Sequence, residues 1–572
     1  MEYPPAPRDD LVEMLHGTPV ADPYRWLEEA ADPRTQQWSA AQDRLFASQR
    51  EGWPGRDWLR ARLAELLAVG EVSVPVWRGE RQFLVRREAG QEHGVLLVVE
   101  PSGTQRTLVD PVAVDPTGTT TLDSWLPSEE GDLLAYLLSS GGDEQSAIRV
   151  LDVATGELVE GPIDRAPYSS IAWLPGGREY FCTRYQDPAL VPGENAQLHR
   201  RVYRHTVGTD PATDQLVFGD GAPRGMYFDV DLSRDGRWLA VTAQQGTDAA
   251  NDLYLADLSA PTLAFVPLQS GVDALTWIAI DAAGTTGYLW TRRDAPRGRI
   301  CTVPLGHPDL STVEWRELVA EDPEAVLQDF VLLDEAGQLL VAWRRHAVSE
   351  LTVHDAATGA LLRRLSLPGI GSIGSLSARG GPRGIEVRPE GGHEAWFSYT
   401  DFTTPEQVLR YDARSGEVSR WATPPGAPPP VQAATRQVSY PSRDGTTVRM
   451  FLIEPPGPTR PRPTILDGYG GFNIAREPTY TPVILAWVRA GGAYAIACLR
   501  GGSEEGEAWH RAGMLQHKQN VFDDFHAAAD WLVGHGVCAP STLGIRGGSN
   551  GGLLVGAALT QRPEAYAAVV CS

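Results

Sequence analysis

The spacing of hydrophobic and polar positions changes twice along the chain and divides it into three regions. In residues 1–70, Asp32-Pro33 can cap a helix over 35–49, and leucines at 59, 63, 66 and 67 recur at helical spacing. Residues 71–430 consist of short apolar runs separated by Gly, Asp and Pro, which is typical of β-strands. From residue 431 onward, strand-like and helix-like segments alternate. We therefore expect three structural regions.

The middle region contains an internal repeat. Seven glycine turns, each just before a hydrophobic strand, recur about every 50 residues, which is the length of one four-stranded propeller blade. This spacing predicts a seven-bladed β-propeller over 71–430, and a pair of irregular β-sandwiches is the alternative. The seven glycines are Gly79, Gly131, Gly177, Gly236, Gly284, Gly337 and Gly392.

A proline-rich stretch at 421–430 predicts a linker into the third region, 431–572. There the turn Ser442-Arg-Asp-Gly445 separates two strand patterns and predicts an antiparallel hairpin. The following segments predict an α/β-hydrolase sheet, only part of which falls within these residues. They are strands at 463–466, 493–499, 543–546 and 567–571, and helices at 482–490, 521–533 and 553–560.

One motif in this region predicts a nucleophile. Gly547-Gly-Ser-Asn-Gly551 is a G-x-S-x-G sequence between a predicted strand and a predicted helix. A sharp strand-to-helix turn exposes a serine hydroxyl, and the helix N-terminus favours the negative charge that develops during attack. The G-x-S-x-G pattern alone is common in a glycine-rich chain, so the prediction depends on its position between a strand and a helix. We predict that Ser549 is a catalytic nucleophile.

A nucleophilic serine also needs hydrogen-bond donors for the oxyanion of the tetrahedral intermediate. The backbone N–H of Asn550, directly after the serine, is one such donor in an elbow of this kind. The loop Leu466-Asp-Gly-Tyr-Gly-Gly-Phe472 follows a predicted strand and offers the Tyr469 hydroxyl as a second. The alternative for Tyr469 is a loop aromatic that only packs.

Composition narrows the possible partners. The net charge of -23 argues against a nucleic-acid partner, since proteins that bind phosphate backbones concentrate Lys and Arg. No apolar run is long enough for a membrane span, and the N-terminus lacks the pattern of a secretory signal. Five scattered cysteines form no metal-binding spacing, so we expect no metal, and reduced thiols fit a cytoplasmic protein. Lys518 is the only lysine, and we assign it no function from the sequence.

Six separated motifs follow one another along the chain. They are His16-Gly-Thr-Pro-Val-Ala-Asp-Pro-Tyr-Arg-Trp-Leu-Glu28, Phe402-Thr-Thr-Pro405, Gly468-Tyr-Gly-Gly-Phe-Asn473, Arg500-Gly-Gly502, Trp509-His510 and Gly547-Gly-Ser-Asn-Gly-Gly552. Together, and in this order, they resemble the prolyl oligopeptidase family of serine peptidases. The resemblance spans essentially the whole chain and implies a hydrolase domain, built from residues 1–70 and 431 onward, with the propeller inserted between them.

The same resemblance implies roles for individual residues. Ser549 attacks, the Tyr469 hydroxyl and the Asn550 N–H hold the oxyanion, and Phe472 helps to line a proline pocket. No cofactor or metal is implied, and short peptides are the expected substrates. Ser-Asn-Gly-Gly fits the proline-specific branch of the family better than the branch that cleaves after basic residues. The implied activity is a serine-type oligopeptidase or endopeptidase that works through an acyl-enzyme.

The sequence departs from the family's pattern after the nucleophile. In the family the triad Asp and His follow the serine, yet residues 550–572 contain no histidine and one acid, Glu564. We therefore assign no triad Asp or His, and expect the chain to be C-terminally incomplete and inactive as it stands. The alternatives are a non-catalytic propeller and hydrolase binding module, and a serine esterase of the same fold.

Upstream candidates for the missing groups lie in the wrong part of the chain order. His510, His517, His526 and His535 are expected at surface or helix-packing positions, and Asp523 and Asp524 at an ordinary helix start. The sequence assigns no oligomeric state.

Overall fold

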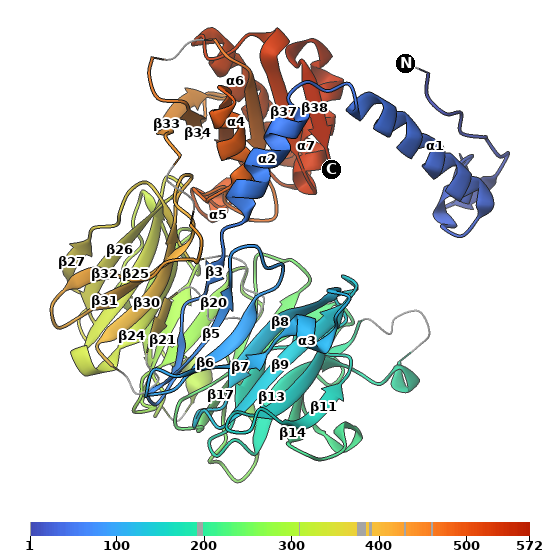
Figure 1. The fold of residues 1–572 in the computed structure, drawn as a ribbon. Helices are drawn as coiled ribbons and strands as arrows, with labels where there is room; N and C mark the ends of the chain where they lie inside the picture. The colour runs from blue at the N-terminus through green and yellow to red at the C-terminus, as the bar shows by residue number, and fades with distance from the viewer. Residues whose placement is uncertain are drawn as a thin grey trace. The chain divides into compact units, whose positions relative to one another are not determined.

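The computed structural model describes residues 2–191, 198–307, 309–374, 385–387, 392–427, 431–458 and 461–572. By their internal contacts these residues form two compact units, Met1–Ala64 and Glu65–Ser572. The first unit appears in dark blue in Figure 1. In the described part of the chain, no helix combines the length and the apolar character that crossing a membrane would require.

The first unit contains a β-hairpin and two helices. β1 (Val12–Leu15) pairs antiparallel with β2 (Thr18–Ala21), and the 3-10 helix η1 (Arg25–Glu28) follows. α1 (Pro33–Arg50) begins where the sequence predicts, because the Asp32 side chain accepts a hydrogen bond from the Arg34 N–H. α2 (Arg56–Leu67) carries the predicted leucine pattern and continues into the second unit.

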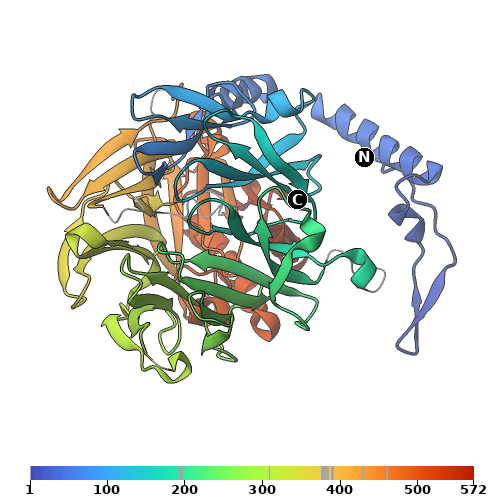
Figure 2. The same cartoon turned by 90° about the horizontal axis from the view of Figure 1, so that it is seen from below.

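The propeller has seven sheets among the described residues, as predicted, and Figure 2 shows them following one another around a ring. Five sheets have four strands in sequence order, and the first and last have five. The strands are β3 (Glu71–Val72), β4 (Val76–Arg78), β5 (Arg81–Arg87), β6 (Val95–Val99), β7 (Gln105–Val109); β8 (Thr120–Pro127), β9 (Leu133–Ser140), β10 (Ala147–Asp152), β11 (Leu158–Ile163); β12 (Ile171–Trp173), β13 (Glu179–Tyr185), β14 (Arg200–Thr206), β15 (Gln215–Phe218); β16 (Met226–Leu232), β17 (Trp238–Gln245), β18 (Asp252–Asp257), β19 (Phe265–Gln269); β20 (Thr276–Ile280), β21 (Thr286–Thr291), β22 (Arg299–Pro304), β23 (Arg316–Val319); β24 (Ala325–Leu333), β25 (Gln338–Arg345), β26 (Val348–Asp355), β27 (Leu361–Leu365); and β28 (Ser372–Ile373), β29 (Ile385–Val387), β30 (Glu394–Thr400), β31 (Gln407–Asp412), β32 (Glu417–Ala422).

Each repeated glycine precedes the strand that lies second along the four-stranded path of its blade. These strands are β5, β9, β13, β17, β21, β25 and β30. The glycines ahead of the first six have a positive φ, a conformation that closes a tight hairpin and that glycine adopts without strain. The glycine period therefore predicted the number of blades because each blade needs the same turn at the same place.

The first and last blades pack against each other and close the ring. Trp77 on β4 and Trp396 on β30 are both buried, with ring centroids 5.2 Å apart. The predicted linker at 421–430 begins later than expected, because Trp421 and Ala422 still belong to β32, while residues 428–430 lie outside the described residues. The exact domain boundaries at 70 and 430 stay predictions.

A buried histidine joins two neighbouring blades. His205 on β14 is fully buried, with its Nδ1 2.5 Å from Asp214 Oδ1 and its Nε2 hydrogen-bonded to Glu160 on β11. Arg184 also forms an ion pair with Asp214. Burial alone would lower the pKa of His205, but the hydrogen bonds to Asp214 and Glu160 outweigh it and raise that pKa to about 9. The imidazole is therefore charged at neutral pH.

This arrangement predicts a dependence of stability on pH. Since the pKa of His205 lies above its unfolded value of 6.5, its stabilisation is complete below about pH 6.5 and is lost as the pH rises through about 9. We expect the free energy of unfolding, measured with denaturant, to fall over this window and to fall less in His205→Gln. The exposed His16→Gln is the control. Equal pH slopes for wild type and His205→Gln would contradict the prediction.

The third region is a six-stranded sheet with the order β33-β34-β36-β35-β37-β38. Its first two strands pair as the predicted antiparallel hairpin around Ser442–Gly445, β34 pairs antiparallel with β36, and the remaining pairs are parallel. The strands are β33 (Ala434–Pro441), β34 (Thr447–Glu454), β35 (Thr464–Gly468), β36 (Ala493–Cys498), β37 (Leu543–Gly547) and β38 (Ala568–Cys571); the α-helices are α4 (Pro482–Arg489), α5 (Glu507–Arg511), α6 (Gln519–Gly534) and α7 (Asn550–Gln561).

Ion pairs connect the propeller to this sheet domain within the second unit. Arg344 at the end of β25 pairs with Glu477 at 2.5 Å, and Arg292, just after β21, pairs with Glu507 at 3.0 Å. The Arg344, Glu477, Arg292 and Glu507 side chains are each at most 10% exposed, so these pairs are shielded from solvent more than surface pairs are. They tie one rim of the propeller to the domain that carries Ser549.

Candidate active site

Ser549 stands at a sharp turn between β37 and α7. Its backbone has φ 57° and ψ -121°, a region that residues other than glycine rarely occupy. Its N–H donates to the carbonyl oxygen of Ser572 at 2.9 Å, and its carbonyl accepts from the Leu553 N–H in the first turn of α7. This strained strand-to-helix turn is the elbow that the sequence motif predicts for an exposed nucleophile.

The glycines of the motif are required because the backbone leaves no room for side chains. A Cβ on Gly547 would lie 2.1 Å from the Gly551 carbonyl oxygen, and a Cβ on Gly551 would lie 2.8 Å from that of Gly468. Gly468 ends β35, so the elbow closes directly onto the strand that precedes the Tyr469 loop. The G-x-S-x-G spacing thus reflects close backbone contact as well as chemistry.

The loop after β35 contacts the elbow, which brings Tyr469 and Asn550 together. The Asn550 Nδ2 donates to the Tyr469 carbonyl oxygen at 2.6 Å. A Cβ on Gly471 would lie 2.5 Å from the same Nδ2, so only glycine fits beside Asn550. In the described residues neither the Ser549 hydroxyl nor the Tyr469 hydroxyl has a hydrogen-bond partner. Both hydroxyls are therefore available to a substrate, and their assigned roles stay predictions.

Phe472 lies at the exposed end of this loop. Its backbone φ is 53°, followed by Asn473 with φ 58°, and its side chain is 59% exposed. The ring is therefore more than half exposed, and it belongs to none of the hydrophobic clusters of the described residues. Its position is compatible with a pocket wall, and that role stays a prediction.

Sequence reasoning missed the contribution of Lys518. Its Nζ donates to the Gly470 carbonyl oxygen at 2.8 Å and to the Asn550 Oδ1 at 3.1 Å, and burial lowers its pKa. The lysine therefore fixes the Tyr469 loop and the residue after the nucleophile to each other. The one available signal was that it is the only lysine in the chain.

We expect Lys518→Met to lower the free energy of unfolding by about 1–3 kcal/mol, since it leaves a half-buried carbonyl and amide oxygen without their donor. Denaturant unfolding measures the change. Arg443→Gln is the control, because its side chain is 81% exposed and such changes typically stay within about 0.5 kcal/mol. Equal effects from the two substitutions would show that Lys518 does not hold the loop.

The expectation for Asp524 was wrong. α6 begins at Gln519, and Asp524 lies inside it with no exposed surface. Its carboxylate accepts from Arg500 Nε at 3.0 Å and from the Ser442 hydroxyl at 2.5 Å, while a second Arg500 nitrogen pairs with Asp444. The Arg500-Gly-Gly motif thus anchors its strand end to α6, because a buried carboxylate requires a charged partner.

The histidines of this region have contacts away from Ser549. His510 is buried with its Nδ1 2.8 Å from the Gly501 carbonyl oxygen, and the His526 Nδ1 lies 2.9 Å from the Tyr566 hydroxyl. His535 stacks on Trp531, with centroids 4.1 Å apart. Within the described ranges no histidine is hydrogen-bonded to the Ser549 hydroxyl, so no general base is assigned.

A serine elbow at the end of a parallel strand, joined to a seven-bladed propeller, defines a serine hydrolase of the α/β type. The model of the prolyl oligopeptidase N-terminal beta-propeller domain matches residues 4–424, and that of the prolyl oligopeptidase family matches residues 479–572. The chain therefore belongs to the prolyl oligopeptidase family of serine peptidases.

Individual relatives agree with this assignment. The prolyl endopeptidase of Elizabethkingia meningoseptica is 31% identical over 570 residues, covering 99% of this chain and 77% of the relative. The alignment with a solved structure from an analysis of two prolyl endopeptidases covers 100% of this chain and 82% of the solved chain, with a TM-score of 0.89 and 35% identity. Prolyl oligopeptidase B from Galerina marginata, bound to a 35mer substrate, has a TM-score of 0.89 at 25% identity and covers 99% of this chain and 82% of its own.

Proposed function

We propose that this protein hydrolyses short peptides on the carboxyl side of proline, with Ser549 as the nucleophile and without metal or cofactor. The observation that carries the proposal is the Ser549 elbow packed against the glycine-rich Tyr469 loop. The name of the relative from Elizabethkingia meningoseptica, a prolyl endopeptidase, supports proline as the preferred residue. A cytoplasmic location is part of the proposal and is supported by the free cysteines of the described residues.

The geometry supports acyl-enzyme chemistry. The Ser549 Oγ attacks the carbonyl carbon of the scissile bond, and the carbonyl oxygen becomes an oxyanion that accepts hydrogen bonds from the Asn550 N–H and the Tyr469 hydroxyl. Collapse expels the amine of the leaving peptide and leaves an ester on Ser549, which water then hydrolyses. Both steps need a histidine to accept and return a proton, and an acid to orient that histidine.

Covalent binding of a peptidyl-prolyl boronate tests the proposal, because a boronate forms a tetrahedral adduct with a serine hydroxyl and imitates the intermediate. We expect mass spectrometry to locate the adduct on Ser549, with none in Ser549→Ala, and a matched peptidyl-glycyl boronate to bind more weakly. An adduct elsewhere would contradict the assigned nucleophile. Absence of any adduct would favour a non-catalytic binding module, and equal affinities would favour a hydrolase without proline preference.

We expect Phe472→Ala to reduce the preference for the prolyl over the glycyl boronate by about tenfold, the scale of losing apolar contacts with a small ring. The affinity ratio of the two boronates measures it, and unfolding should change little because Phe472 is exposed. Leu515→Ala, another exposed apolar residue at 76%, is the control. An unchanged ratio in Phe472→Ala would remove Phe472 from the pocket.

A further inference from the structure

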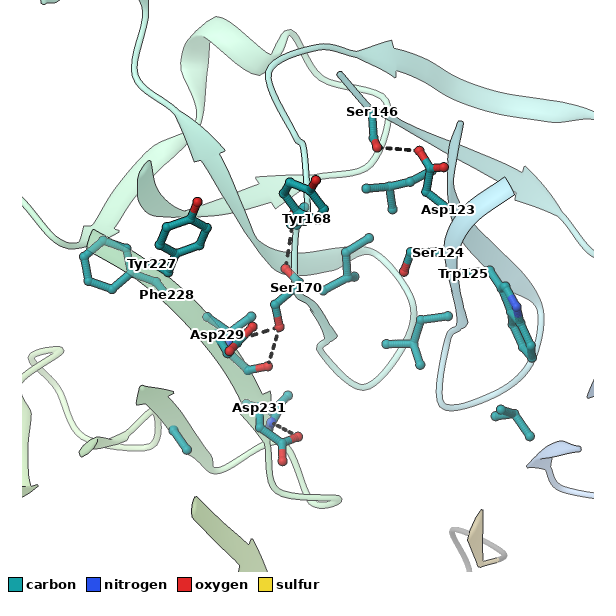
Figure 3. A pocket seen from close by; sticks show the side chains of 18 of the residues that line it. Asp123, Ser124, Trp125, Ser146, Tyr168, Ser170, Tyr227, Phe228, Asp229 and Asp231 are labelled. Atoms are coloured by element: carbon teal, nitrogen blue, oxygen red, sulfur yellow. Dashed lines mark hydrogen bonds between the residues drawn. The ribbon is translucent and has the colours of Figure 1, made fainter. Parts of the chain in front are cut away.

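The propeller contains a pocket lined only by propeller residues. Its volume is about 910 Å³, within the range of ligand pockets in proteins, and its walls come mainly from the inner strands of several blades. Figure 3 shows Tyr168 and Tyr227 near each other at one part of the wall, with Asp229 and Asp231 along β16 and Asp123 across the opening. The pocket therefore combines aromatic and charged groups.

Arg200 lines this pocket and is buried as a cation among tyrosines. Only 5% of it is exposed, and its guanidinium carbon lies 4.0 Å from the centroid of Tyr227, 4.6 Å from that of Tyr185 and 6.0 Å from that of Tyr168. One guanidinium nitrogen donates to the Tyr185 hydroxyl at 3.0 Å, and the Nε has no hydrogen-bond partner. We refer to these three tyrosines as the Arg200 cage.

Other buried arginines of the chain show what Arg200 lacks. Arg184, Arg344 and Arg500 each pair with a carboxylate. Arg201 and Arg462 donate to backbone carbonyl oxygens instead. Arg200 has neither kind of acceptor among the described residues, although burying a charge without a counter-charge is costly. A buried guanidinium at a pocket wall, with aromatic faces but no anion, is a site suited to an anionic ligand.

The Arg200 cage faces the domain that carries Ser549. Arg200 starts β14 and is paired with Tyr185 at the end of β13. In the fifth and sixth blades the equivalent ends, after β21 and β25, hold Arg292 and Arg344, which pair with Glu507 and Glu477 of the sheet domain. Since blades of one propeller share the same strand direction, Arg200 lies at this same rim. A peptide reaching Ser549 from the propeller side passes this rim.

The other charges of the pocket limit what can bind. Six acidic residues also line it, and their carboxylates repel a ligand with several negative charges; they are Asp123, Glu129, Glu144, Asp229, Asp231 and Asp329. A single carboxylate on an otherwise neutral or basic peptide meets the guanidinium with less of that repulsion. This balance favours a peptide carboxylate over a phosphate or another polyanion.

We propose that Arg200 is a binding residue for a carboxylate of the peptide substrate, held at the propeller rim away from the scissile bond. The inference rests on the proposed function, since it assumes a peptide substrate. It adds a preference for peptides that carry a carboxylate, which the Ser549 elbow does not determine. The carboxylate belongs either to the C-terminus of the peptide or to an Asp or Glu side chain. Both present the same bidentate acceptor to a guanidinium.

Fluorescence anisotropy with labelled proline-containing peptides tests the proposal without relying on turnover. Three peptides share one neutral sequence: one ends in an amide, one in a free carboxylate, and one is amidated with a single Gln replaced by Glu. We expect at least one carboxylate peptide to bind roughly tenfold to a hundredfold more tightly than the neutral amide. The peptide that does so identifies the source of the carboxylate.

Arg200→Gln should abolish this difference, while Arg234→Gln should retain it. Arg234 lines the same pocket but is exposed, so the control removes the same charge outside the Arg200 cage. Arg200→Lys, which retains the charge without the planar fork, should give an intermediate difference, and it serves as the second variant if Arg200→Gln does not fold. Thermal unfolding of all three variants checks folding.

Three outcomes would contradict the proposed carboxylate site at Arg200. Equal binding of all three peptides to the wild-type chain excludes it while leaving proline-peptide binding intact. An equal loss in Arg234→Gln shows a general field effect and no specific site. If no peptide binds while the prolyl boronate still forms its adduct on Ser549, the carboxylate site is excluded and the nucleophile stands; if neither binds, the proposed function fails as well.

Discussion

Tyr469→Phe is expected to weaken binding of the peptidyl-prolyl boronate by about 10² to 10³, the usual effect of removing one oxyanion donor. A boronate adduct places a negatively charged oxygen where the oxyanion of the intermediate would form, so its affinity reports stabilisation of the transition state. The Tyr469 loop is fixed to the elbow by Asn550 and Lys518, and its hydroxyl has no other hydrogen-bond partner among the described residues. Competition against a fluorescent peptide measures the affinity.

Tyr440→Phe is the matched control. The Tyr440 hydroxyl is buried in the same domain without a hydrogen-bond partner, so its removal deletes the same atom away from Ser549. We expect the control to bind the boronate as the wild type does. A similar affinity for Tyr469→Phe and wild type would return Tyr469 to a packing role and leave the Asn550 N–H as the assigned donor.

The arrangement of the domains could be predicted because it depends on local patterns that repeat. The glycine turns before β5, β9 and the later strands mark the same hairpin in every blade, so their period gave the blade number. In the sheet domain, the turn at Ser442–Gly445 predicted the antiparallel hairpin at its start. The alternating strand and helix segments that follow predicted the parallel strands. These features need only residues that are close in sequence.

The contacts that complete the site join residues far apart in sequence, and no local pattern indicates them. Lys518 reaches Gly470 across 48 positions and Asn550 across 32. Asp524 was expected at a helix start, yet it is the buried partner of Arg500. The Arg200 cage is of the same kind, since Tyr168, Tyr185 and Tyr227 belong to three separate segments of the propeller.

The roles of Ser549, Tyr469, Asn550 and Phe472 were assigned from a motif and a resemblance. The structure adds the strained backbone at Ser549 and the contact between Asn550 and the Tyr469 loop. It also explains the glycines, whose Cβ positions are occupied by backbone or by Asn550. How each side chain acts on a substrate depends on its contacts with the reacting atoms. Boronate binding to the wild type and to the variants measures those contacts.

The polypeptide of residues 1–572 is expected to hydrolyse a fluorogenic prolyl peptide about 10⁶ times more slowly than a serine peptidase with a complete triad. A serine hydroxyl is a weak nucleophile near neutral pH unless a histidine accepts its proton. In the described ranges His510 and His526 are hydrogen-bonded to Gly501 and Tyr566, and no histidine reaches Ser549. Only the oxyanion donors and substrate binding then contribute, leaving an acceleration of about 10³ to 10⁴ over water.

The rate should therefore be low although the elbow is formed. We expect the residual hydrolysis to depend weakly on Ser549, while the boronate adduct still requires it, because adduct formation needs the hydroxyl and the oxyanion donors more than it needs a base. Comparing wild type with Ser549→Ala in both assays separates the two effects. Rapid hydrolysis that disappears in Ser549→Ala would show that a base within these residues serves the serine, and substituting His510, His517, His526 and His535 one at a time would identify it.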